Sequence, residues 1–297
     1  MTLGMLLALL CGCGHALRVG GPPRMQQPPP PPAAAAAERW FVSVPNTFEA
    51  LAEQTRRSTV GAARQGGHRR VLVEASAPEL DPSSGACRLP ELVRFAQDVA
   101  QPLVGSGLLP ASLPMVKLLF ASSADATFAG ASVMDTSLPV SVLGHENAVG
   151  PRDGAFVVVA PSARPSEPQL ATDAAVEAAL SRLMTVAAGR LVVLINPRLG
   201  GDSAILESFE PAYFMRPLSL AYLKDQYAKQ VDRVRCCLVR CYPHEWSVLY
   251  ESEGAWRYAG RFEQQPLAEE LEAKLRESIT KERNGRLRQQ EQGAGES

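Results

Sequence analysis

The chain contains 297 residues, of which 46% are hydrophobic and 21% are charged, so it holds enough apolar material for one or two globular domains. Its formal net charge at pH 7 is −1, and no cluster of lysine and arginine stands out in the globular part. Because nucleic acids and anionic lipids are bound by concentrated basic faces, this pattern argues against nucleic acid or a lipid surface as the main partner.

Residues 1–37 are predicted to be a targeting presequence followed by a proline and alanine linker. Leu3–Leu10 is an apolar run, and Gly14–Ala16 follows it with the small-x-small pattern of a signal-peptide cleavage site. The run is too short to cross a bilayer, which takes about 20 apolar residues.

The stretch behind the signal peptide is basic and free of acidic residues up to Glu38. Such a stretch resembles the bipartite presequence of proteins sent into plastids bounded by extra membranes; the alternative is a simple secretory signal with a linker. Cysteine usage favours the plastid, because few cysteines follow the presequence. Adjacent Cys236 and Cys237 would also point to opposite faces of a strand, which does not suit a disulfide framework.

From Trp40 the sequence predicts helices alternating with strands. Asn46 and Glu49 form a capping-box pattern at the start of a helix that ends near residues 66–67, and a second helix starts at Pro90. Short β-branched runs bounded by turn residues predict the strands, and an amphipathic pattern predicts a further helix. The strands are expected at residues 71–75, 116–121, 140–143 and 155–160, with that helix over 175–187.

The predicted fold is organised around the stretch from Arg190 to Asp202. Residues 191–195 form an unbroken apolar run, which predicts a strand buried on both faces in the middle of a parallel sheet. Pro197 lacks an N–H and ends the strand.

After Asp202 the pattern changes. Residues 209–218 are aromatic and are expected to be irregular, whereas 234–242, 246–251 and 255–262 predict an antiparallel meander. A closing helix is expected over 267–279, and the charged tail from residue 280 to 297 is expected to be frayed or disordered. The predicted fold is therefore a single α/β domain over 38–279. It has a mainly parallel, Rossmann-like, three-layer sheet flanked by helices, a C-terminal antiparallel meander and a closing helix.

A ligand site is predicted at the carboxyl edge of the sheet, where open α/β folds bind their ligands. Arg198 could recognise a carboxylate or phosphate, or it could instead make a structural ion pair while Asn196 caps a turn. The ends of neighbouring strands should converge on the same edge. The predicted ligand-binding residues are Asn196, Arg198, Asp202, Asp125 and His145.

No residue is assigned a catalytic role, and no cofactor or metal is expected. Ser122 and Ser123 could form a triad with a histidine and an aspartate at this edge, but no G-x-S-x-G elbow is present and the two serines have the pattern of a helix N-cap. The cysteines at 236, 237 and 241 with His244 have ligand chemistry, but they lack the paired spacing of a zinc site and are more simply buried apolar residues. The phosphate-binding glycine fingerprints of nucleotide enzymes are absent.

Four segments together resemble one family. They are V-P-N-T-F at 44–48, L-I-N-P-R-L at 194–199, F-E-P-A-Y-F-M-R-P-L at 209–218 and R-C-Y-P-H-E-W-S-V-L-Y at 240–250. They are similar to an uncharacterised domain family of plants, algae and cyanobacteria that includes the "low photosystem II accumulation" assembly factors. A similar domain follows the kinase part of a chloroplast adenylate kinase. The resemblance covers about residues 40–275 and implies plastid residence and, as in the plant members, a role in photosystem II assembly; it brings no catalytic residues.

These observations favour a non-enzymatic plastid protein, in the stroma or associated with the thylakoid. It is expected to bind a protein partner, such as a photosystem II subunit or assembly factor, with only peripheral contact to the membrane. The alternative is a small-molecule or nucleotide-binding α/β protein, or an enzyme, that acts at the carboxyl edge of the sheet. A third reading is a regulatory module for a separate nucleotide enzyme.

Overall fold

The computed structural model describes residues 43–81, 84–199, 203–223 and 231–294. The predicted presequence, over residues 1–37, lies outside the described residues. The described part contains a nine-stranded sheet, flanked by helices, in the order β3-β2-β4-β5-β1-β6-β7-β8-β9. The strands are β1 (Arg70–Ala75), β2 (Met115–Phe120), β3 (Val140–Val142), β4 (Asp153–Val159), β5 (Leu191–Ile195), β6 (Glu210–Leu223), β7 (Val231–Cys241), β8 (Trp246–Ser252) and β9 (Ala255–Phe262).

The strands run parallel in one half of the sheet and antiparallel in the other. Neighbouring strands from β3 to β6 are parallel, and those from β6 to β9 are antiparallel. The α/β class, the mainly parallel sheet and the C-terminal antiparallel meander are therefore as predicted. The flanking α-helices are α2 (Phe48–Arg64), α3 (Leu89–Ala100), α4 (Ser123–Ser132), α5 (Asp173–Val186), α6 (Ala204–Glu207) and α7 (Ala268–Ala294).

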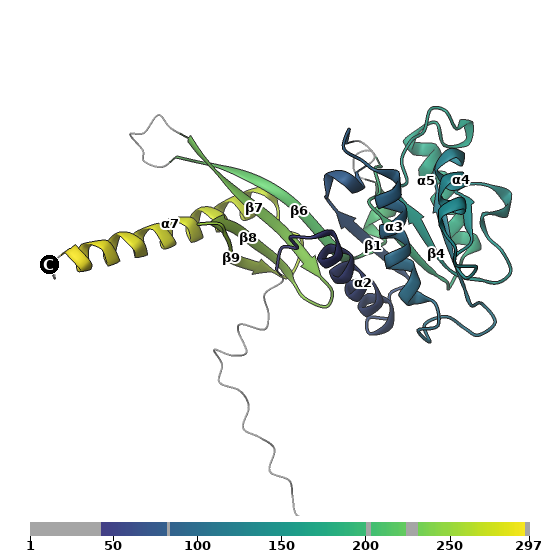
Figure 1. Cartoon of the computed structure of the whole chain (residues 1–297), viewed down its shortest axis with the longest axis horizontal. Helices are drawn as coiled ribbons and strands as arrows, with labels where there is room; N and C mark the ends of the chain where they lie inside the picture. The colour runs from purple at the N-terminus through teal and green to yellow at the C-terminus, as the bar shows by residue number, and fades with distance from the viewer. Residues whose placement is uncertain (1–42, 82–83, 200–202, 224–230, 295–297) are drawn as a thin grey trace, which may run out of the picture. The chain divides into compact units, whose positions relative to one another are not determined.

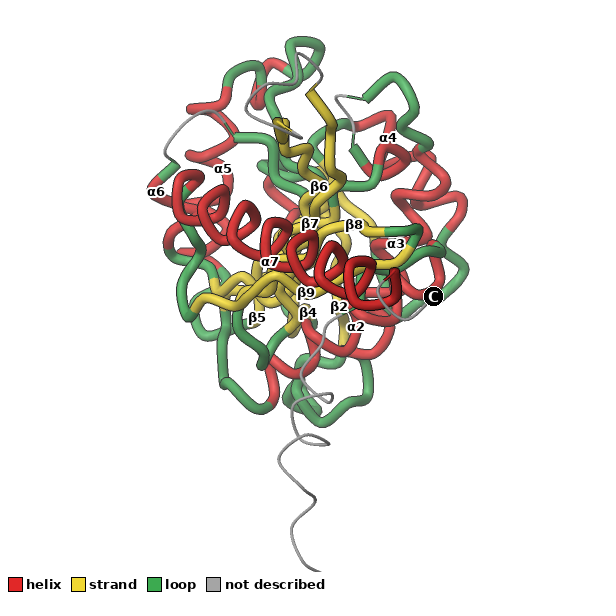
Figure 2. The backbone as a smooth tube through the Cα atoms, turned by 90° about the vertical axis from the view of Figure 1, so that its left-hand side faces the viewer, coloured by secondary structure: helices red, strands yellow, loops and turns green. Residues whose placement is uncertain are grey.

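Three clusters of buried apolar side chains pack the helices against the sheet. On one face of the parallel half, alternate residues such as Val73 and Val193 pack with α2, α3 and α4. On the opposite face, Leu194 and its neighbours pack with α5. The third cluster joins the meander to α7, which runs along β8 and β9 (Figures 1 and 2). The strands β1, β2, β4 and β5 thus contribute residues to both of the first two clusters and are covered on both faces, which explains their continuous apolar runs.

The prediction for residues 191–195 is confirmed. All five residues of β5 are buried, and the strand lies between β4 and β1, inside the sheet. The backbone turns at Asn196, whose φ is 45°, and Pro197 follows it. The polar stretch after β5 is therefore delivered to the carboxyl edge, as the sequence indicates.

The expectation that residues 209–218 are irregular is wrong. Residues 210–218 belong to β6, a strand of 14 residues that pairs with β1 up to Met215 and with β7 from Tyr213 to Leu223. Pro211 and Pro217 lower the strand propensity of this segment, which is why the sequence pattern misses it. Pro217 is tolerated because β1 has ended there, so β6 is paired on one side only.

The expected end of the closing helix is also wrong. Helix α7 continues through residues 280–294, which were expected to be frayed or disordered. Tyr250 donates a hydrogen bond to Glu282 at 2.7 Å, and Arg286 donates to Ser252 at 2.8 Å, so β8 holds this half of α7. Propensity and charge alone do not report such tertiary contacts. Within the described residues, no helix has both the length and the apolar character needed to cross a bilayer.

A smaller correction concerns the first helix. Thr47, rather than Asn46, is the N-cap of α2, and its side chain accepts a hydrogen bond from the Ala50 backbone N–H at 3.1 Å. Both residue types can cap, so the sequence does not separate two adjacent candidates.

Candidate functional site

Asn196 connects the ends of β5 and β1. Its side chain is 3% exposed, its Oδ1 accepts from the Ala75 N–H at 2.7 Å, and its Nδ2 donates to the Ala75 and Leu80 carbonyls at 3.1 and 3.2 Å. The amide thereby joins β1 to the short 3-10 helix Pro78–Leu80. Its donors and its acceptor face the protein backbone, so Asn196 shapes the edge of the sheet.

Arg198 lies two residues beyond Asn196 on the same edge, where it forms a β-bridge with Ser162. It forms an ion pair with Asp81 at 2.8 Å, and its own side chain is 41% exposed. Its backbone N–H donates to the Pro161 carbonyl, which holds the segment after β5 beside the segment after β4. Asp202, the third polar residue of the predicted group, lies outside the described residues.

The ends of β2 and β4 bring a second set of polar residues together. Asp125 lies 3.5 Å from Arg164, and both Ser123 N–H and Ser123 Oγ donate to Glu167, at 2.8 and 2.7 Å. These hydrogen bonds, with a smaller effect from His145, hold the pKa of Glu167 below its ordinary value. His145 precedes a short 3-10 helix after β3.

Cys87 lies near both ion pairs. Burial is the main reason that the pKa of its thiol is raised, and the carboxylates of Asp81 and Asp125 add to the effect, while Arg164 opposes it. A raised pKa leaves less thiolate, the reactive form, at neutral pH. We use "carboxyl rim" for the set Asp81, Cys87, Ser123, Asp125, His145, Arg164, Glu167, Asn196 and Arg198.

The polar groups of the carboxyl rim contact one another. The arginines face carboxylates, Ser123 faces Glu167, and Asn196 faces backbone. Within the part of the chain that the structure describes, Ser122 and Ser123 form hydrogen bonds with Asp125 and Glu167 rather than with His145, so the described rim lacks the nucleophile–base contact of a triad.

A cavity lies elsewhere on the same edge, where α2 and α3 begin. Its volume is about 490 Å³, and Arg94 and Glu49, 3.7 Å apart, lie on its wall with Phe48 below the guanidinium at 5.3 Å. None of the described residues predicted for ligand binding lines it. The lining residues are Pro45, Asn46, Thr47, Phe48, Glu49, Leu51, Ala77, Glu79, Glu91, Arg94 and Met215.

Comparison with protein families assigns residues 45–273 to a domain of unknown function, DUF1995. The chain belongs to this family. The match includes β1–β9 and the start of α7, so the parallel sheet and the meander are parts of one DUF1995 domain. This confirms an uncharacterised domain family over residues 45–273, close to the range of about 40–275 that the four sequence segments indicate. A search of curated proteins finds no significant match.

The three cysteines of the DUF1995 domain meander are buried in two different places. Cys236 packs in the cluster under α7, and Cys237 and Cys241 pack in the cluster under α2. Burial raises the pKa of Cys236 to about 11 and those of Cys237 and Cys241 to about 12. In the part of the chain that the structure describes, no three histidine, cysteine or acidic side chains gather as metal ligands would.

The sequence reasoning missed the partners of the residues that it selected. Asp81, Arg164 and Glu167 lie in loops that follow β1 and β4, so the argument that places Arg198 at the carboxyl edge also applies to them. The sequence signal that could have identified these partners is a side chain of opposite charge in the loop after a neighbouring strand. The cavity beside α2 and α3 gives no comparable signal, because its wall comes from helix N-termini far apart in the chain.

Proposed function

We propose that the protein is a non-catalytic factor of the plastid that binds a protein partner at the thylakoid and thereby assists photosystem II assembly or accumulation. The family assignment is to an uncharacterised domain, and the link to photosystem II rests on the resemblance of the four sequence segments. The surface that best supports protein binding is one face of the meander.

That face carries aromatic and arginine side chains on β7 and β9. The Arg235 guanidinium lies over the Trp256 ring, 5.9 Å from its centroid, and forms an ion pair with Glu251 at 2.9 Å. Tyr258, two residues after Trp256 on β9, is 37% exposed. These residues lie on the side of the sheet opposite Tyr250, which packs under α7. Tryptophan, tyrosine and arginine are the residue types that most often dominate the energetics of protein interfaces. This aromatic face, defined as Arg235, Trp256 and Tyr258, is the observation that carries the proposal.

The arrangement of the carboxyl rim supports the same reading. Its two arginines each form an ion pair with a carboxylate of the rim, as they would in a structural role. Partner binding at the meander needs none of these groups to be released.

The experiment is crosslinking and affinity purification from plastids. The tagged wild-type chain should capture a thylakoid membrane protein, and the double substitution Arg235→Ala, Trp256→Ala should reduce its recovery at least about tenfold, as expected for loss of two interface anchors. Arg257→Ala is the matched control, because Arg257 pairs with Tyr250 in the register and so lies on the α7 side of β9. Recovery only as a free stromal protein, without a photosystem subunit, would refute the proposal.

Plastid residence has a separate test. A fluorescent protein fused behind residues 1–37 should enter the plastid, and replacing Arg18 and Arg24 with glutamate should divert it to the secretory route. Secretion of the unchanged fusion would instead favour a simple signal peptide with a linker.

A second candidate function rests on the cavity beside α2 and α3. A volume of about 490 Å³ is within the range of small-molecule sites, and Arg94 supplies a cation beside an apolar floor. A ligand at a hundredfold excess over its Kd stabilises the native state by about 2.7 kcal/mol, which a thermal-shift screen detects. Arg94→Ala should remove the shift if the cavity is the site, and Arg198→Ala should remove it if the carboxyl rim is.

A further inference from the structure

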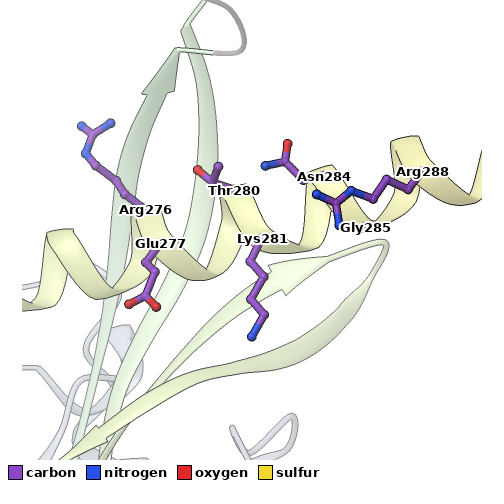
Figure 3. A pocket seen from close by; sticks show the side chains of 7 residues that line it. All are labelled: Arg276, Glu277, Thr280, Lys281, Asn284, Gly285 and Arg288. Atoms are coloured by element: carbon purple, nitrogen blue, oxygen red, sulfur yellow. The ribbon is translucent and has the colours of Figure 1, made fainter.

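The outer surface of α7 bears a groove of about 670 Å³ that is lined mainly by the side chains of polar and charged residues (Figure 3). The inner face of the helix carries Leu275, which is 1% exposed, together with Leu271 and Ile279, and packs on the meander. Figure 3 shows Glu277 and Lys281 pointing to the same side of the helix, whereas Thr280 and Asn284 point to the other. The groove is lined by Arg276, Glu277, Thr280, Lys281, Asn284, Gly285 and Arg288.

Charge along the exposed part of α7 changes sign from one end to the other. Its exposed charged residues are Glu269, Glu270, Glu272, Arg276 and Glu277 in the first half and Lys281, Arg283 and Arg288 in the second. Lys274 lies 3.2 Å from Glu277, while no ion pair within the described residues engages Lys281 or Arg288. An acidic patch and a basic patch therefore lie on one helix surface, separated along its axis.

The spacing of these charges makes the surface complementary to itself. Glu277 and Lys281 each lie two residues from Ile279, and Glu270 and Arg288 each lie nine residues from it. An antiparallel copy of α7 with its two-fold axis at the level of Ile279 places Glu277 opposite Lys281 and Glu270 opposite Arg288. By symmetry each pair occurs twice, as an isologous interface requires.

Gly285 is a second and independent observation. Glycine inside a helix costs about 0.5–1 kcal/mol relative to alanine, and a Cβ at this position would meet no atom of the chain within 4 Å. Nothing within the described residues therefore requires glycine at this position. A helix that approaches closely from outside would benefit from the missing side chain.

We propose that two copies of this chain associate through the outer faces of their α7 helices, packed antiparallel about Ile279. The contact spans residues 270–288, or roughly 27 Å of helix, and is almost entirely polar. Such a contact is smaller than the area that a stable dimer usually buries, about 1,200–2,000 Å² in total. The dimer is therefore weak, reversible and sensitive to salt, which distinguishes it from an obligate dimer.

Sedimentation velocity of the chain beginning at Glu38, over a concentration series, tests the proposal. A monomer–dimer equilibrium is expected at low ionic strength, and it should shift to monomer at about 1 M salt, where the Debye length is about 3 Å. A single monomeric species throughout the series would overturn the proposal, as would a dimer that salt does not affect.

Charge substitutions test whether the outer face of α7 forms the dimer interface. Lys281→Glu should weaken the dimer at least about tenfold, because it replaces two attractive pairs with two repulsive ones. Adding Glu277→Lys should restore it, because the pairs are then rebuilt with their signs exchanged. Arg57→Glu is the control, since it makes the same charge change on α2 at a side chain that is 79% exposed, and the dimer should be unaffected.

Two results would overturn this interface. One is a dimer that Lys281→Glu leaves unchanged, and the other is a failure of the double variant to recover while its circular dichroism and melting temperature match wild type. The test is independent of the aromatic face, because Arg235→Ala, Trp256→Ala alters partner capture and leaves α7 untouched.

Discussion

At the residue scale, Asn196 shows how a polar residue in a site-like position can be committed to structure. Positive φ is uncommon for residues other than glycine, and asparagine adopts it more readily than most. The same conformation aims the amide of Asn196 at the end of β1, where it replaces hydrogen bonds that the sheet ladder no longer supplies. A sequence motif at a strand end therefore identifies the position without identifying the role.

Asn196→Ala should lower the free energy of unfolding by about 2–4 kcal/mol. The Ala75 N–H and two carbonyls lose their partners in a buried setting, and alanine is strained at a φ of 45°. Urea denaturation measures the change. Asn196→Gly relieves the backbone strain but does not restore the hydrogen bonds, so its free energy of unfolding should lie between those of the wild type and the alanine variant. A loss below about 0.5 kcal/mol for the alanine variant would contradict the structural role of Asn196.

The cysteines give a second prediction at this scale. In a chain beginning at Glu38, Cys87 should be the one thiol that reacts with Ellman's reagent in the native state, because it is half-buried whereas Cys236, Cys237 and Cys241 are buried with strongly raised pKa values. All four should react in denaturing urea. The native reaction should accelerate with rising pH, since the pKa of Cys87 is also raised, and Cys87→Ser should abolish it. Rapid reaction of several thiols in the native state would show that the meander core is open.

At the scale of elements, β6 is the segment that joins the two halves of the sheet. It is parallel to β1 and antiparallel to β7, so the parallel ladder passes into the meander without a break. Helix α7 then covers one face of that meander. Its far half depends on contacts with β8, at Tyr250 and Ser252.

Glu282→Gln should reduce the pH dependence of stability in acid. Burial opposes ionisation of Glu282, but hydrogen bonds from Tyr250, Arg286 and Ser252 outweigh it and lower its pKa. A lowered native pKa contributes stability above the ordinary glutamate value, and that contribution is lost as pH falls through the native pKa. The loss at neutral pH should be no more than about 1 kcal/mol, because the side chain is one-quarter exposed and solvent screens it.

Urea denaturation at neutral pH and at a series of falling acidic pH values follows the loss of this contribution as the carboxyl group is protonated. The variant and the wild type should differ at neutral pH and converge in acid. Glu263→Gln, at an exposed position just after β9, is the matched control and should leave the pH profile unchanged. An unchanged profile for Glu282→Gln would show that Tyr250 and Ser252 do not anchor α7.

At the scale of the whole molecule, three apolar clusters stabilise one continuous sheet, and the third depends on α7. Phe214 and Trp246 pack edge to face with ring centroids 4.9 Å apart, beneath Leu275 of the helix. The meander therefore needs α7 to keep this face away from water.

A chain that ends at Gln265 should expose this third cluster. It should bind the dye ANS and aggregate as its concentration rises, because the apolar side chains beneath α7 become accessible. A chain that ends at Ala294 is the control, since it keeps the whole of α7. If the shorter chain remained monomeric and free of bound dye, the cover supplied by α7 would be dispensable.

The sequence by itself determined the alternation of helices and strands, the buried strand at 191–195 and the carboxyl edge that follows it. These features are readable because hydrophobic periodicity and turn residues act over a few neighbouring positions. The proline-containing strand β6 and the second half of α7 were missed, because partner strands stabilise them against their local preference.

Only the tertiary structure decided what the polar residues at the edge contact. Asn196 bonds to Ala75 across 121 positions of the chain, and Arg198 pairs with Asp81 from another loop. Such pairs depend on the order in which strands lie in the sheet. No local pattern encodes that order, because it is set by the simultaneous burial of many side chains far apart in sequence.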